Sequence, residues 1–300
     1  MSGLAKSIWR SLRPKQWTKN LVVLAALVFA AGDRAQHIDL PHIWIALAAM
    51  AIFCVVSSAV YLLNDIKDVE QDRAHPTKRL RPIAAGELSE GFARSLALLL
   101  LAAGIAGAWR LGSSFLYVIL AYLALQACYV YGLKKVALVD LFIIATGFVL
   151  RALAGAVAIH VLISPWLLLC TLLLALFLAL CKRRHELVVV NDGAGQTRQS
   201  LRDYDQRLLD QLISIMAAAT VVCYALYTLS PETVTKFGTS QLGFTIPFVI
   251  FGLFRYLDLV YRHEQGGRPE QILLTDVPLL VDLALYGLTV GVVLFVTRIS

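Results

Sequence analysis

The chain has 300 residues, of which 59% are hydrophobic and 16% are charged. Soluble domains average roughly 45–50% apolar and about 25% charged residues, so this composition excludes an ordinary soluble protein. The net charge of +7 is not gathered in a soluble basic module, which excludes a nucleic-acid-binding protein and favours anionic lipid or anionic substrate as partner. The five cysteines lie scattered in apolar stretches without metal-ligand spacing and are interpreted as small buried hydrophobes.

Nine apolar segments follow one another along the chain, and most reach the roughly 17–25 residues that cross a bilayer. They lie near residues 19–32, 43–65, 91–109, 114–131, 138–160, 165–181, 208–229, 243–261 and 277–297. The first segment is short, and it is compatible with either a tilted helix or a partly interfacial one. The sequence therefore predicts an all-α membrane protein, a bundle of nine transmembrane helices in a single domain over residues 1–300.

The loops between these segments differ in charge. If the N-terminus lies in the cytoplasm, the segments on that side hold nineteen Lys and Arg residues and those on the other side hold four. Under the positive-inside rule this difference predicts a cytoplasmic N-terminus in a plasma (inner) membrane protein. The two largest polar loops, 66–90 and 182–207, then face the cytoplasm together.

The first of these loops belongs to the stretch YLLNDIKDVEQDRAHPTKRLRP, residues 61–82. If the second apolar helix continues through it, Asn64, Asp68 and Asp72 share one face, with Asp65 beside that face. Carboxylates four residues apart repel each other by a few tenths of a kcal/mol, and a divalent cation reverses this repulsion. One amide and two or three carboxylates suit Mg²⁺. The alternative is a solvated loop whose acids pair with its own cations.

The same residues carry a family resemblance. NDIKDVEQD matches NDxxDxxxD, and it resembles the first aspartate-rich motif of the UbiA superfamily of intramembrane prenyltransferases. Seven further segments resemble the decaprenyl-phosphate phosphoribosyltransferase branch of that superfamily. They are LRPKQWTKNLVVLAA, HPTKRLRPIAAG, YGLKK, LRALAGAVA, KRRHEL, TRQSLRDY and RPEQILLTD, spread from Arg13 to Asp276. Ordinary relatives have a second aspartate-rich motif, whereas the loop 182–207 has Asp192, Asp203 and Asp205 but no DxxxD.

The resemblance implies a Mg²⁺-dependent pentosyltransferase whose acceptor is a polyprenyl phosphate and whose donor is 5-phosphoribosyl 1-diphosphate (PRPP). It also implies a role in making the arabinose donor of a cell-wall polysaccharide. Breaking the bond between ribose C1 and the diphosphate builds positive charge on the ribose and negative charge on the leaving group. We therefore predict Asp65, Asp68 and Asp72 as catalytic and Asn64, Asp68 and Asp72 as metal ligands.

The substrates carry phosphates, so cations near the motif are candidate ligands. The predicted substrate-binding residues are Lys19, Tyr61, Lys78, Arg79, Arg81, Lys134, Lys135, Arg151, Lys182 and Arg183. Arg151 lies deep in the membrane, where it needs an anionic partner; lipid phosphate is preferred over a buried acid such as Asp282. The acceptor phosphate is already anionic, so we expect His75 to be a hydrogen-bonding or structural group rather than a base.

Two other functions stay open at this stage. The first is a conventional prenyltransferase that joins a prenyl diphosphate to an aromatic or lipid acceptor. The second is a transporter of anionic lipid without enzymatic activity. Transporters bind their cargo near the bilayer midplane, whereas most charges of this chain lie in loops on one side.

Overall fold

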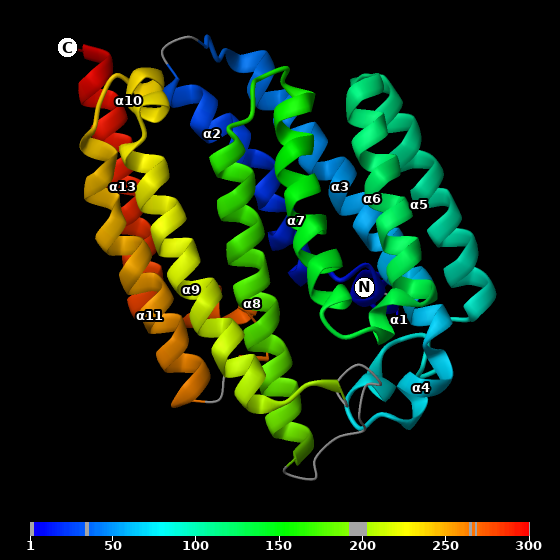
Figure 1. Ribbon diagram of the computed structural model, residues 1–300. Coiled ribbons are helices and arrows are strands. Elements are labelled where there is room, and N and C mark those ends of the chain that lie inside the picture. Colours follow the sequence, from blue (N-terminus) through cyan, green and yellow to red (C-terminus); the bar gives the residue numbers. More distant parts are fainter. Residues whose placement is uncertain (1–2, 34–35, 192–202, 264–265, 268, 300) are drawn as a thin grey trace.

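The computed structural model describes residues 3–33, 36–191, 203–263, 266–267 and 269–299. Long helices run side by side and form a bundle (Figure 1). They are α3 (Leu40–Lys67), α5 (Glu90–Leu111), α6 (Ser113–Tyr131), α7 (Val139–Ala158), α8 (Pro165–Asn191), α9 (Gln206–Leu229), α11 (Ile246–Tyr261) and α13 (Val277–Ile299). Within the described residues, eight helical segments are long and apolar enough to cross a membrane, α11 being counted with the 3₁₀ turn η5 (Gln241–Thr245) before it.

The predicted count of nine spans is not confirmed, because the first predicted span takes a different form. Its residues are divided between the 3₁₀ helix η1 (Pro14–Leu24) and the short α2 (Ala25–Gly32). A left-handed turn at Arg13, with φ 54°, precedes η1. Asn20, in the middle of η1, is 1% exposed, and its amide nitrogen lies 3.3 Å from Ser57 of α3. A polar side chain anchored in this way ties η1 to α3, so the segment packs as part of the bundle wall.

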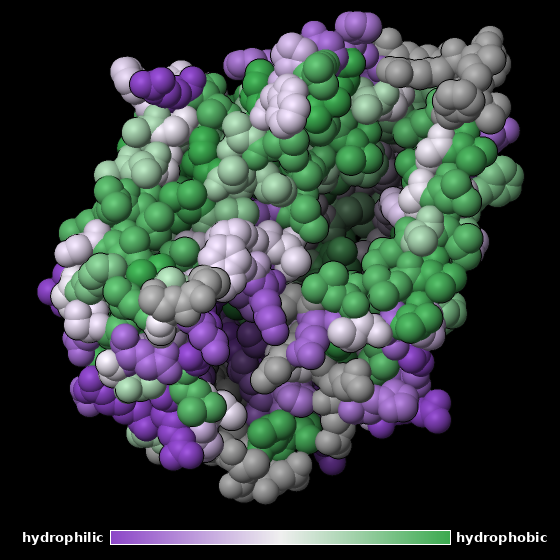
Figure 2. Space-filling model, turned by 180° about the vertical axis from the view of Figure 1, so that it is seen from behind, coloured by the Kyte–Doolittle hydropathy of each residue, from purple (hydrophilic) through white to green (hydrophobic). Residues whose placement is uncertain are grey.

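The short elements gather at the two ends of the bundle. They are α1 (Gly3–Leu12), α4 (Val69–Ala74), η2 (Lys78–Leu80), η3 (Leu133–Lys135), α10 (Pro231–Phe237) and α12 (Pro269–Thr275). The end that carries α4 also carries the last turn of α8 and the first turn of α9, whereas α2 and α10 lie toward the opposite end (Figure 1). Hydrophilic residues gather at the α4 end, where the surface is hollowed, and apolar side chains cover much of the rest (Figure 2).

Helix α7 connects the two largest hydrophobic clusters. One cluster joins α7 to α8, α9 and α11 around residues such as Phe177 and Leu209. The other joins α7 to η1, α3 and α6 around Phe53 and Ile119. In the most apolar stretch of α7, 56% of the residues are buried, against 17–44% in the other candidate spans. Because α7 is central, the charged residues that it carries are held in fixed surroundings.

The crossing of α7 and η1 depends on Gly155. A Cβ atom added at Gly155 would lie 1.8 Å from the carbonyl oxygen of Val23, a backbone atom that cannot rotate away. We expect Gly155→Ala to destabilise the protein by about 1–3 kcal/mol, because the two helices must separate. Gly287→Ala on α13 is the control, since nothing lies within 4 Å of its added Cβ. Thermal unfolding of both variants in one detergent tests this, and equal midpoints would contradict it.

Candidate active site

The aspartate-rich segment is not one continuous helix. Helix α3 ends at Lys67 and α4 begins at Val69, with Asp68 between them at φ −98° and ψ 9°. Backbone hydrogen bonds still cross the junction, from the Asp68 amide to the Asn64 carbonyl and from the Asp72 amide to the Asp68 carbonyl. The second apolar helix therefore does not continue through the segment without a break, and the break falls at one residue. That residue changes which carboxylates face each other.

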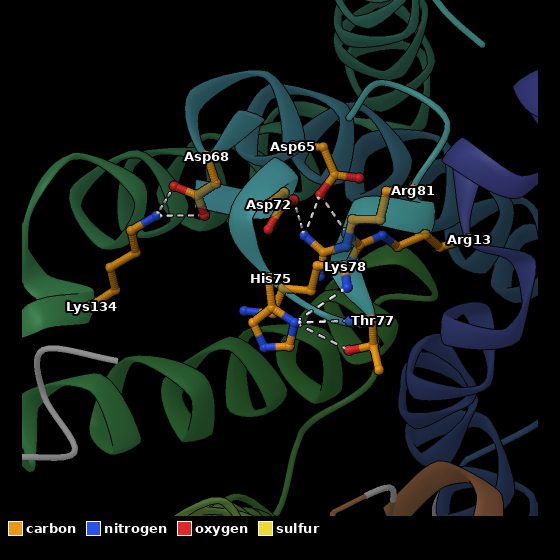
Figure 3. A network of polar contacts seen from close by, with 9 residues as sticks. All are labelled: Arg13, Asp65, Asp68, Asp72, His75, Thr77, Lys78, Arg81 and Lys134. Carbon is orange, nitrogen blue, oxygen red and sulfur yellow. Dashed lines mark hydrogen bonds and ion pairs between the residues drawn. The ribbon is translucent and has the colours of Figure 1, made fainter. Parts of the chain in front are cut away.

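Asp65 and Asp72, seven residues apart, share one arginine. Arg81 Nη1 lies 3.0 Å from Asp65 Oδ1 and 2.6 Å from Asp72 Oδ2, and Arg13 Nη2 lies 2.5 Å from the same Asp65 oxygen (Figure 3). Both aspartates are 3% exposed. Burial raises the pKa of Asp72, and the charge on Arg81 opposes that rise. Asp65, expected beside the acidic face, therefore shares Arg81 with Asp72 and also pairs with Arg13.

Asp68 points toward a different cation. Lys134 Nζ, on η3, lies 2.6 and 2.8 Å from the two oxygens of Asp68, and Figure 3 shows this pair apart from the Arg81 group. The side chains are 14% exposed for Lys134 and 19% for Asp68, so water still reaches the pair. The structure thus brings together two predicted site residues that lie 66 positions apart. The neighbouring Lys135 is exposed.

His75 shapes the turn that presents the next cations. Its Nδ1 accepts hydrogen bonds from the backbone amides of Thr77 and Lys78, at 3.2 and 3.3 Å (Figure 3). Burial lowers the pKa of His75, and the charge on Lys78 lowers it further. A neutral imidazole that accepts from the backbone is a structural group, in agreement with the role expected for it. Lys78 and Arg79 are exposed beyond this turn.

The donor chemistry of the segment fits a hard divalent cation, because it offers amide and carboxylate oxygens. Their present arrangement does not form a metal centre: in the described ranges, no three His, Cys, Asp or Glu side chains lie close enough to hold an ion. Asp65, Asp68 and Asp72 are each bound to Lys or Arg instead. A cation that bound here would therefore have to displace Lys134 from Asp68 or Arg81 from Asp72.

Arg151 lies in the interior of the bundle and is 6% exposed. Its guanidinium donates to the Asn20 side chain at 2.8 Å, to the Gly147 carbonyl at 2.8 Å and to the Tyr122 hydroxyl at 3.0 Å. It also lies 4.9 Å from the centre of the Tyr122 ring. All of these partners are neutral, and Asp282 is not among them. Within the described part of the chain, no carboxylate forms an ion pair with this buried cation.

Arg183, another predicted substrate ligand, lies on α8 and is buried against the start of α7. Its Nε donates to Asp140 Oδ2 at 2.9 Å, and a second ion pair joins it to Glu186. Arg183 is 2% exposed and Asp140 0%. The Tyr204 hydroxyl donates to the other oxygen of Asp140 at 3.0 Å. Four groups from α7, α8 and the chain before α9 thus form one network, in which only Glu186 is partly exposed, and Arg183 points into this network rather than toward Asp68.

The remaining predicted residues lie around these groups. Tyr61 has the Arg13 guanidinium 4.9 Å above its ring, while Lys19 on η1 and Lys182 on α8 are partly buried. In the second acidic loop, Asp205 accepts a hydrogen bond from the Leu208 amide and caps α9, and Asp203 is exposed. Asp192 lies outside the described residues.

Sequence reasoning missed four polar residues of these networks. Arg13 and Asn20 contact predicted site residues from η1 and the turn before it, and Tyr122 and Asp140 do so from α6 and α7. Arg13 and Asn20 belong to LRPKQWTKN, a segment already singled out, and polar residues inside an apolar span were a further signal. Their partners lie 29 to 131 positions away, a pairing that no local pattern specifies.

Comparisons with known proteins agree with this fold. The model of the UbiA prenyltransferase family matches residues 21–272. A decaprenyl-phosphate phosphoribosyltransferase from Mycolicibacterium smegmatis is 39% identical over 92% of this chain and 87% of its own length. The enzyme of that name from Corynebacterium glutamicum is 39% identical over 91% and 82%. A UbiA homologue from Archaeoglobus fulgidus, solved with GPP and Mg²⁺, superimposes with a TM-score of 0.70 at 19% identity, covering 96% of this chain and 99% of its own. This membrane protein belongs to the UbiA prenyltransferase family.

Proposed function

We propose that this protein transfers the phosphoribosyl group of PRPP to a polyprenyl phosphate and releases diphosphate. The main support is the similarity over about nine-tenths of the chain to relatives named decaprenyl-phosphate phosphoribosyltransferase. The site agrees with it, because cations from three separate parts of the chain surround the aspartates. Arg13 comes from the turn before η1, Arg81 from the loop after α4 and Lys134 from η3.

The reaction breaks the bond between C1 of the ribose and the diphosphate oxygen, and it forms a bond between C1 and an oxygen of the lipid phosphate. Exposed Lys78 and Arg79, with Arg81 and Lys134 behind them, would bind the diphosphate and stabilise its growing charge. Buried Asp65 and Asp72 supply negative potential for the cationic ribose. The attacking oxygen is already anionic at neutral pH, so the reaction needs no general base.

Asn64, Asp68 and Asp72 would hold a divalent cation, for which Mg²⁺ is our proposal. The cation would neutralise diphosphate charge in the same site. The support is the oxygen-only donor set together with the Mg²⁺ bound by the Archaeoglobus homologue. Lys134 would then leave Asp68 and become free to contact the donor phosphates. We further propose that the protein lies in the inner membrane with the α4 end of its bundle facing the cytoplasm. We also propose that the product serves cell-wall arabinan synthesis.

A second candidate is a conventional prenyltransferase, because structures of this fold bind GPP or DMAPP. The test is a direct competition of donors. Purified protein is incubated with Mg²⁺ and a short polyprenyl phosphate, with either PRPP or a prenyl diphosphate as donor. Our proposal expects a phosphoribosylated lipid and free diphosphate only with PRPP. Release of diphosphate only from the prenyl donor would favour the second candidate, and no reaction with either donor would leave anionic-lipid transport as the function to examine.

We expect the two phosphate-bearing substrates to depend on different cations. Lys78 is exposed, where a soluble sugar diphosphate arrives, whereas Arg151 lies deep, where only a phosphate carried by a membrane lipid is expected. A charge-assisted contact is worth about 1.5–3 kcal/mol, or roughly ten- to a hundredfold in affinity. Arg151→Met should therefore raise KM mainly for polyprenyl phosphate, and Lys78→Met mainly for PRPP. Both constants are measured for both variants in one detergent, and equal changes in both constants would indicate a single shared pocket.

A further inference from the structure

The loop that carries Lys134 is held in an unusual backbone conformation. It runs from the end of α6 through η3 to Leu138, immediately before α7. Leu138 has φ 65° and ψ −45°, in a region that residues with a side chain rarely adopt. Such a conformation persists only where neighbouring groups impose it. Lys134 lies four residues before this point, so the direction of the turn decides where its amine can reach.

A group from another part of the chain binds the backbone of this turn. The Leu138 amide donates a 2.6 Å hydrogen bond to the hydroxyl of Tyr204, 66 positions away. That hydroxyl in turn donates to Asp140 Oδ1 at 3.0 Å, and the other oxygen of Asp140 is bound by Arg183. Tyr204 is 6% exposed, so water does not compete well for these bonds. One hydroxyl therefore links the strained turn to a buried ion pair.

We propose that Tyr204 is a positioning residue, which holds the α6–α7 turn so that Lys134 reaches Asp68. This inference rests on the proposed function, since it gives Lys134 a part in binding the donor diphosphate. It also gives a shared role to three segments singled out in the sequence, YGLKK, KRRHEL and LRDY. They contribute Lys134, Arg183 and Tyr204. Lys134 would act on the substrate, and Tyr204 would act only through the turn.

The decisive variant is Tyr204→Phe, which removes the hydroxyl and keeps the ring. Of the two hydrogen bonds that this variant loses, the one from the Leu138 amide holds the turn, and its loss is worth about fivefold in an equilibrium. We expect KM for PRPP to rise about fivefold, with little change in KM for polyprenyl phosphate. Tyr224→Phe is the matched control, because it removes hydroxyl bonds to Thr245 and Tyr286 in a separate, partly buried cluster.

A second readout does not depend on activity. Lys134 is partly buried and ion-paired in the wild type, whereas Lys135 beside it is exposed. An amine-reactive ester followed by mass spectrometry gives the ratio of labelling at the two lysines. Tyr204→Phe should raise labelling of Lys134 relative to Lys135, and Tyr224→Phe should leave the ratio unchanged. A folded Tyr204→Phe protein with the wild-type ratio would overturn the proposal even if the enzyme used a different donor.

Leu138→Gly separates positioning from general stability. Glycine adopts φ 65° without strain, so the turn should hold its direction with less help from Tyr204. The double variant Leu138→Gly/Tyr204→Phe should recover part of the lost PRPP affinity and of the Lys134 protection. If Tyr204 only stabilised the bundle, glycine would add no recovery. Hydrogen exchange of the Leu138 amide in the wild-type protein is expected to be slow, and fast exchange would contradict the proposal without any variant.

Discussion

Replacing Asp68 with asparagine is expected to lower turnover with PRPP about a thousandfold, the effect of removing one group that stabilises charge in a transition state. The variant loses a carboxylate that we propose as a metal ligand and keeps the shape of the side chain. Its stability should change by no more than about 1 kcal/mol, because the ion pair with Lys134 is partly open to water. Initial rates over a Mg²⁺ titration and thermal unfolding in the same detergent measure both effects.

Asp258→Asn is the matched control for this variant. Asp258 also forms ion pairs, with Arg255 on α11 and with Arg262 directly after it, but these arginines contact none of the aspartates of the site. It should retain nearly normal turnover. Lys134→Met separates the ion pair of Asp68 from its proposed role as a metal ligand. It breaks the same ion pair and leaves the carboxylate, so the Mg²⁺ dependence should stay close to normal. Near-normal rates for Asp68→Asn at every Mg²⁺ concentration would show that the metal is bound elsewhere.

Arg183→Met is expected to destabilise the protein by about 3–5 kcal/mol, because it leaves the carboxylate of Asp140 buried with no cation. Arg183 is 2% exposed and Asp140 0%, so water cannot replace the lost partner. The double variant Asp140→Asn/Arg183→Met should be less destabilised than Arg183→Met alone, since Asp140 then carries no charge and Glu186, the other partner of Arg183, is 30% exposed. Unfolding by a titrated denaturing detergent gives the free-energy differences for the complete cycle.

Arg184 provides the comparison for Arg183. It pairs with Asp210 near the same end of α8, but the side chain of Asp210 is 35% exposed. Arg184→Met should therefore destabilise the protein much less than Arg183→Met. KM for PRPP should change little in the folded fraction of Arg184→Met. In that of Arg183→Met it should rise by no more than about the fivefold expected for Tyr204→Phe, because Arg183 contacts Tyr204 only through Asp140. A stable Arg183→Met protein with a greatly raised KM for PRPP would mean that Arg183 contacts the donor, as the sequence suggested.

The sequence alone indicated the membrane class and most of the helices. Eight of the nine predicted spans correspond to helices long and apolar enough to cross a bilayer, because such a helix satisfies its own backbone hydrogen bonds and needs only a long apolar run. The family resemblance was also readable, since NDIKDVEQD and the basic segment after it are local patterns. Residues 19–32 were less predictable, because Asn20 of η1 contacts α3 and α7, which are both distant in sequence.

The partners of the charged residues were decided by the tertiary structure. Counting along a continuous helix grouped Asp68 with Asp72, but the break at Asp68 turns Asp68 toward Lys134 and leaves Asp72 with Arg81. The two basic loops, 66–90 and 182–207, look alike in sequence, yet Lys78 of the first is exposed and Arg183 of the second is buried. A buried charge is stable only with a partner of suitable geometry, and that partner comes from whichever helix the packing brings near. Apolar runs and motifs are local and can be read along the chain, whereas these pairings join residues up to 131 positions apart and exist only once the bundle has formed.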